Sequence, residues 1–175
     1  RSKRIAAALT SLTTIVATTF ATISAAPAHA ADSNTSVPPE ITMPGSPDGI
    51  PSAGNGPIKL FIYPASVYAL AHPGTNPQGA NNFSCKPREG QNPVVLLPGT
   101  NFDAYASWSM YAPKLTKLGY CVFSPNFNGL KLLPSFAYTG DIRVSAKAVS
   151  GFVDRVLTAT ESKRVDLIGW SQGGG

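Results

Sequence analysis

The chain has 175 residues, which is enough for one domain and a tail. Only 13% of the residues are charged, against about a quarter in average soluble domains, so the composition argues against a charge-rich cytosolic domain. The net charge of +5 falls to +2 without Arg1, Lys3 and Arg4, because 11 basic residues then face 9 acidic ones; with no basic patch left, we expect no nucleic-acid partner.

Residues 1–30 have the parts of a secretory signal peptide. A basic start, "RSKR", precedes the apolar stretch "IAAALTSLTTIVATTFATISAA", and Ala28 and Ala30 supply small residues before a cleavage point. A transmembrane anchor is the alternative, but Thr and Ser dilute the stretch and no basic stop-transfer cluster follows it. We therefore expect a secreted, extracellular protein without a stable membrane anchor.

Residues 31–82 are expected to form a leader rich in proline and glycine that is partly disordered. Residues 32–93 hold 11 of the 16 prolines, and such a segment buries too little apolar surface to offset its ordering entropy. We expect disorder from residue 31 to about residue 57. The apolar stretch "IKLFIYPASVYALA" (58–71) is either a short strand or a strap laid over the core.

From residue 93 the sequence predicts alternating strands and helices. The stretches "PVVLL" (93–97) and "YCVFS" (120–124) are short apolar runs, typical of buried strands. Between them, residues 108–119 are predicted to form one helix that ends at Gly119. The apolar side of this helix would carry Met110, Tyr111, Leu115 and Leu118.

A long amphipathic helix is predicted at residues 141–160, capped by Asp141, and a third strand, "VDLIG", at residues 165–169. The apolar stripe of the helix would consist of Ile142, Ser145, Ala146, Val149, Phe152, Val153, Val156 and Leu157. The alternation of strands and helices predicts an α/β fold with a mostly parallel sheet and helices on both faces. The connection at residues 125–140 is long, as expected of a loop that contributes to a site.

The third predicted strand leads directly into "GWSQG" (169–173). In a Gly-x-Ser-x-Gly nucleophile elbow the serine sits on a strained turn between a strand and a helix, which lifts its hydroxyl out of the sheet. The flanking glycines are needed because Cβ atoms there would collide with neighbouring elements. Ser171 is therefore the candidate nucleophile, with Gly169 and Gly173 as the elbow glycines.

Pro98-Gly99-Thr100 follows the first predicted strand. In this architecture the loop after that strand donates one backbone N–H to the oxyanion hole, and the residue after the nucleophile donates the other. The two donors would be Thr100 and Gln172, and the Thr100 hydroxyl could serve as a third. A simple tight turn is the alternative for Pro98-Gly99-Thr100.

The chain has two cysteines, Cys85 and Cys121. Export from the cell and an even count make a single disulfide possible. Two free buried thiols are the alternative.

Three stretches together carry a resemblance to a known family: "PVVLLPGTNFDAYASWSMYAPKLTKLGYCVFSPNFNG", "SAKAVSGFVDRVLTAT" and "VDLIGWSQGG". They resemble secreted α/β-hydrolase lipases, namely the class 2 triacylglycerol lipases of bacteria and the Candida antarctica lipase B type. The resemblance covers residues 83–175 and implies the amino-terminal half of an α/β-hydrolase domain, truncated after the elbow.

The resemblance also implies roles for individual residues. Ser171 matches the nucleophile, Thr100 and Gln172 match the oxyanion-hole positions, and the two cysteines resemble a disulfide of the family. Trp170 departs from the histidine of most class 2 lipases and is similar to the Candida type, where it narrows the pocket for the alcohol part of the substrate. Packing against neighbouring loops is the alternative for Trp170.

The expected function is that of a serine hydrolase that cleaves carboxylic esters of the triacylglycerol type through an acyl-enzyme, with no metal or organic cofactor. The partner would be a lipid or another ester at a lipid–water interface, and the complete enzyme is expected to be a monomer. His29 and His72 precede Ser171, whereas the fold places the acid and then the histidine after the serine, so we expect both beyond Gly175 and the chain alone to be inactive. Alternatives are an acyltransferase, cutinase or polyester depolymerase, a non-catalytic binding module, and an inert fragment.

Overall fold

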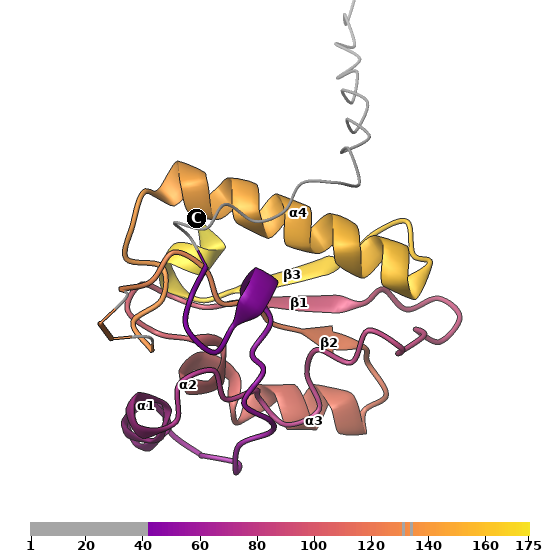
Figure 1. The fold of residues 1–175 in the computed structure, drawn as a ribbon. Helices are drawn as coiled ribbons and strands as arrows, with labels where there is room; N and C mark the ends of the chain where they lie inside the picture. The colour runs from indigo at the N-terminus through magenta and orange to yellow at the C-terminus, as the bar shows by residue number, and fades with distance from the viewer. Residues whose placement is uncertain (1–41, 131, 134) are drawn as a thin grey trace, which may run out of the picture. The chain divides into compact units, whose positions relative to one another are not determined.

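The computed structural model describes residues 42–175 except 131 and 134, so the predicted signal peptide lies outside the described residues. The centre is a three-stranded parallel sheet in the order β2-β1-β3. The strands are β1 (Val94–Leu97), β2 (Val122–Phe123) and β3 (Asp166–Gly169). All three predicted strands are confirmed (Figure 1).

Helices lie on both sides of the sheet, as predicted for an α/β fold, although every residue of β3 is exposed. Helices α2 (Ala104–Trp108) and α3 (Tyr111–Lys117) connect β1 to β2, and α4 (Ile142–Thr160) connects β2 to β3. Figure 1 shows α4 on one side of the sheet and α2 and α3 on the other. Successive residues of β1 point to opposite faces of the sheet. Val95 packs in the hydrophobic cluster that includes residues of α4, whereas Val94 packs with Trp108 and Ala112 on the other face.

The helix predicted at residues 108–119 is wrong in its start and in its buried face. The chain forms two short helices here, and Asp103 begins the first by accepting a hydrogen bond from the Ala106 N–H. Ala112 is buried, whereas Tyr111 and Leu118 are exposed. The predicted end is confirmed, because Gly119 follows α3 with φ +89°.

The long helix α4 is confirmed, including its cap. The Asp141 side chain accepts a hydrogen bond from the Arg143 N–H at 2.8 Å. The predicted stripe is partly wrong, because Ile142 is 55% exposed and Ala146 is also exposed. The buried positions are Ser145, Ala148, Phe152, Val156 and Thr160.

Residues 42–57, expected to be disordered, are packed against the domain, so that expectation is corrected for this segment. Met43, Ser46 and Gly49 are buried, and a short 3-10 turn, η2 (Pro47–Gly49), lies between them. The Asn126 N–H donates to the Gly49 carbonyl at 2.9 Å, and the Asn126 amide donates to the Ser46 hydroxyl at 3.0 Å. Hydrogen bonds to a distant loop therefore order a segment whose composition alone favours disorder.

The apolar stretch after this segment is not a strand but helix α1 (Ile62–Ala71), which packs against α2. Pro64 is compatible with it because it lies in the first turn, where its missing N–H has no helical partner. Ala65 and Ala69 face α2 and are fully buried. Among the described residues, no helix is both long enough and apolar enough to cross a bilayer.

Cys85 and Cys121 form the disulfide, with their Cα atoms 5.7 Å apart. The bond joins the segment before β1 to the residue that precedes β2. It therefore ties the segment before the sheet to the sheet itself.

Candidate active site

Ser171 lies at the turn that follows β3. Strand β3 ends at Gly169, and Ser171 begins the 3-10 turn η3 (Ser171–Gly174). The φ angle of Ser171 is +52°, in the left-handed region that a serine rarely adopts. Such strain costs about 1–3 kcal/mol and is typical of functional turns.

The two elbow glycines occupy positions where a side chain does not fit. A Cβ atom on Gly169 would overlap the Gly173 carbonyl, and one on Gly173 would overlap the Leu97 carbonyl. Both obstacles are backbone atoms, which cannot turn aside as a flexible side chain can. The tight turn that presents Ser171 therefore requires glycine on both sides.

Parallel pairing of β1 with β3 brings the Pro98–Thr100 loop next to the elbow. Leu97 and Gly169 are register partners, and the Trp170 N–H donates to the Leu97 carbonyl at 3.2 Å. The Thr100 hydroxyl then donates to the Gln172 side-chain oxygen at 2.6 Å. The two predicted oxyanion-hole residues, 72 positions apart in the chain, are thus in direct contact.

The main-chain N–H groups of Thr100 and Gln172 are available to a ligand. Neither donates to another described residue, and Thr100 and Ser171 are exposed. Unpaired N–H groups beside a hydroxyl can stabilise negative charge that develops on a bound carbonyl oxygen.

Trp170 forms part of the wall between the elbow and the loop after β1. Its ring meets Phe102 edge to face, with the centroids 5.0 Å apart. A Cβ atom on Gly99 would lie 2.7 Å from Cε3 of Trp170, so the indole packs closely over this loop. These contacts agree with the alternative in which Trp170 packs against neighbouring loops. The residue is 40% exposed, so part of its surface is accessible to a ligand.

His72 is the one histidine among the described residues, and it is engaged away from Ser171. Its ring stacks on Tyr68 with the centroids 4.1 Å apart, and its Nδ1 lies 3.0 Å from the Tyr68 carbonyl at the end of α1. The structure shows no hydrogen bond between His72 and Ser171. Within the described residues, no three His, Cys, Asp or Glu side chains gather as metal ligands do.

Asp103 is a feature that the sequence analysis missed. Its carboxyl group is fully buried; one oxygen accepts from the Ala106 N–H at 2.7 Å, and the other has no hydrogen-bond partner. Burial raises the pKa of Asp103 to about 7, which outweighs the lowering by the Ala106 N–H. An aspartate before an amphipathic run signals a helix cap, but the sequence holds no signal for its burial.

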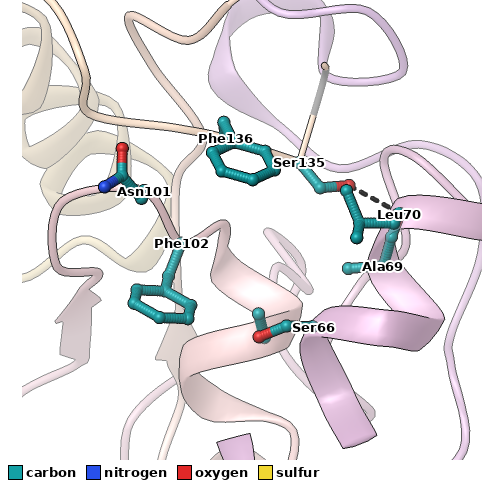
Figure 2. A pocket seen from close by; sticks show the side chains of 8 residues that line it. Ser66, Ala69, Leu70, Asn101, Phe102, Ser135 and Phe136 are labelled. Atoms are coloured by element: carbon teal, nitrogen blue, oxygen red, sulfur yellow. Dashed lines mark hydrogen bonds between the residues drawn. The ribbon is translucent and has the colours of Figure 1, made fainter. Parts of the chain in front are cut away.

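A cavity of about 140 Å³ lies next to the loop that follows β1 (Figure 2). Its walls come from α1, from the loop after β1, from α2 and from the long connection after β2, where the sequence led us to expect a contribution to a site. The lining residues are Ser66, Ala69, Leu70, Asn101, Phe102, Ala106, Ser135 and Phe136.

Comparison with known proteins gives no assignment. No family model matches the chain, and no curated protein matches it. The function therefore has to be inferred from the geometry of the site.

Proposed function

We propose that this chain carries the nucleophile elbow and the oxyanion hole of a secreted serine esterase or lipase with an α/β-hydrolase fold. The observation that carries the proposal is Ser171 at φ +52°, held between two obligatory glycines at the end of a parallel strand. This is the backbone geometry that an elbow needs. The unpaired N–H groups of Thr100 and Gln172 beside it add the donors that an acyl transfer needs.

In the proposed reaction, Ser171 Oγ attacks the ester carbonyl carbon while its proton passes to a histidine base. The carbonyl oxygen becomes an oxyanion that accepts hydrogen bonds from the two N–H groups. Collapse of this intermediate breaks the bond to the alkoxy oxygen, which leaves as the alcohol after taking the proton from the imidazolium. Water then attacks the acyl-Ser171 ester and releases the carboxylic acid.

The histidine and the acid that orients it belong to sequence beyond Gly175 in this proposal. The basis is the order of the triad in the α/β-hydrolase fold, in which the acid and then the histidine follow the serine.

The Thr100 hydroxyl has a positioning role in the proposal. It donates to Gln172 at 2.6 Å and so holds the loop after β1 against the residue that carries the second N–H. Its direct use as a third oxyanion donor would require this hydrogen bond to break.

The proposed substrates are lipids or other carboxylic esters, and the proposed location is extracellular. The location is supported by the disulfide between Cys85 and Cys121, since such bonds persist in oxidising compartments. The proposed enzyme acts as a monomer and takes its substrate from a lipid–water interface.

The test is the substitution Ser171→Ala in the longest natural protein that contains this chain. With an activated 4-nitrophenyl ester, the unchanged protein should give a burst of 4-nitrophenol and an acylated peptide containing Ser171 by mass spectrometry. The substitution should abolish both, because it removes the attacking oxygen. The exposed Ser84→Ala is the matched control and should keep the burst. An undiminished burst in Ser171→Ala would overturn the proposal.

A further inference from the structure

We propose that the cavity beside the loop after β1 is the subsite for one compact apolar group of the substrate, an aryl or alkyl group of about six carbons. This inference deepens the proposed function and rests on it, because it assigns to the ester a group that the elbow alone does not specify.

The size of the cavity sets the size of the group. Its volume is about 140 Å³. An engineered apolar cavity of about 150 Å³ in another protein stays dry and binds benzene, so this cavity suits a group of similar bulk. Leu70 and Asn101 are exposed, so the cavity is open on one side, and the rest of a longer acyl chain would lie outside it.

The lining decides the chemistry of the group. No Lys, Arg, Asp or Glu lines the cavity, and Phe102, Phe136 and Leu70 provide much of its carbon surface. The two hydroxyl groups are already used, because Ser66 donates to the Ile62 carbonyl at 2.8 Å and Ser135 donates to the Ala69 carbonyl at 2.5 Å. A charged or strongly polar ligand group would lose its hydration here without replacement, whereas an apolar group gains by burial.

The position of the cavity connects it to the reacting atoms. Asn101 and Phe102, which line it, directly follow Thr100, and two residues span at most about 7 Å. On the other side, the Phe102 ring contacts Trp170, which precedes Ser171. In the proposed enzyme, the cavity therefore adjoins the loop that carries the Thr100 N–H, and Phe102 contacts both the cavity and Trp170.

The walls are held in place by contacts that do not depend on the ligand. The Asn101 N–H donates to the Ala137 carbonyl at 2.9 Å, which fixes the loop after β1 to the segment that carries Ser135 and Phe136. Figure 2 shows Phe136 and Asn101 across the cavity from Ser66, Ala69 and Leu70 of α1, and Ser135 hydrogen-bonded to α1. The subsite is thus largely preformed, as small-molecule sites usually are.

The first experiment measures binding without catalysis, with benzene as the probe and the longest natural protein that contains this chain. Saturable NMR shifts are expected at Ala69, Ala106 and Phe136. Ser66→Leu places extra carbon inside the cavity and should weaken benzene binding about 10-fold or more. The matched control is Val67→Leu, which enlarges the neighbouring side chain on the same helix, where Val67 is 53% exposed; it should leave binding unchanged.

A second variant guards against the possibility that Ser66→Leu only damages the fold. Phe136→Ala enlarges the cavity, so it should improve binding of naphthalene relative to benzene, which a loss of structure cannot produce. Absence of saturable shifts at the cavity, or equal benzene binding by Ser66→Leu and the unchanged protein, would overturn the subsite whatever the esterase assays give.

Kinetic measurements determine whether the acyl part or the alcohol part of the ester enters the cavity. One series consists of methyl esters with different acyl groups, and the other consists of acetate esters with different alcohols. Ser66→Leu should lower kcat/KM for the aryl or six-carbon member of one series about 10-fold relative to kcat/KM for methyl acetate, and Val67→Leu should not change this ratio. An equal loss for all esters would overturn the subsite. Benzene binding without any Ser171-dependent hydrolysis would instead overturn the proposed function, and with it the substrate role of the cavity.

Discussion

The proposed function depends mainly on the backbone conformation of Ser171 and on the side-chain hydrogen bond of Thr100. Ser171 accepts an unfavourable φ angle because the β3 strand and the two glycines determine the path of the chain on both sides. Thr100 reaches across to Gln172 with one short hydrogen bond. The rest of the candidate site therefore depends on whether these two segments stay in contact.

Thr100→Val tests that contact in the proposed enzyme. Valine keeps the shape but cannot donate to Gln172, so the Thr100 N–H should be held less well and kcat should fall about 10-fold or more, up to the roughly 100–1000-fold cost of losing an oxyanion-hole donor outright. Thr100→Ser restores the hydroxyl and should recover most of the rate. Gln172→Leu, which removes the acceptor, should lower kcat similarly, and the double variant should lose no more than either single one. Additive losses would show that the two side chains act separately.

Asp103 gives a second prediction at the scale of one residue. Its folded-state pKa of about 7 lies above its usual value of 3.8. At pH values between these two, the folded protein keeps a proton that the unfolded chain has released. The free energy of unfolding should therefore fall as pH rises from about 4 to 7, and the total decrease should be at most ~4 kcal/mol. Urea unfolding across this pH range measures the slope.

The substitution Asp103→Asn identifies the group responsible. Asparagine is neutral, resembles the protonated aspartate and can still accept the Ala106 N–H, so the slope should flatten while stability at pH 4 changes little. Replacement of the exposed Glu89 by Gln should keep the original slope. The same slope in Asp103→Asn and the unchanged protein would assign the pH dependence to other groups.

At the scale of elements, α4 shows how burial differs from helical periodicity. The sequence pattern places Ile142 and Phe152 on one stripe, but Phe152 is 1% exposed and packs against Phe83 and Phe127, while Ile142 is 55% exposed. Only the middle and the end of the stripe lie over the sheet. The first turn of α4 extends beyond it.

Phe152→Ala and Ile142→Ala should therefore differ in cost. Removing a fully buried phenylalanine leaves a cavity and should lower the free energy of unfolding by about 3–5 kcal/mol. Ile142→Ala should change it by less than about 1 kcal/mol, because most of the side chain is already in water. Chemical denaturation of both variants measures the difference, and equal costs would show that the first turn is packed after all.

The strands, α4 and the glycine-flanked turn at Ser171 were predictable because each is encoded locally. An apolar run such as residues 93–97, an aspartate cap such as Asp141 and the spacing of Gly169, Ser171 and Gly173 need no knowledge of distant contacts. The order of residues 42–57 depends on hydrogen bonds to Asn126, far along the chain, and the burial of Asp103 depends on how the chain packs around it. Those features could not be predicted from a local pattern.

At the scale of the whole molecule, the disulfide links the part of the chain before the sheet to β2. It closes a loop of 36 residues, for which the chain-entropy model gives about 3–4 kcal/mol of stabilisation. We expect Cys85→Ala with Cys121→Ala to lower the free energy of unfolding by about this amount. The measurement is urea denaturation, with dithiothreitol added to the unchanged protein as an independent way to open the same bond. Equal stability with and without the bond would contradict the prediction.

The pairing of β1 with β3 also sets an order in time. Gln172 is synthesised 72 residues after Thr100, and at about 5–20 residues per second a ribosome needs several seconds to cover that distance. During this interval β1 can pair with β2 but not with β3, so one edge of the central strand stays open to other chains. Among the three described strands, the contact between Thr100 and Gln172 therefore forms only after β1 and β2 can pair, and a pause in synthesis before residue 166 prolongs the time in which that edge of β1 is unpaired.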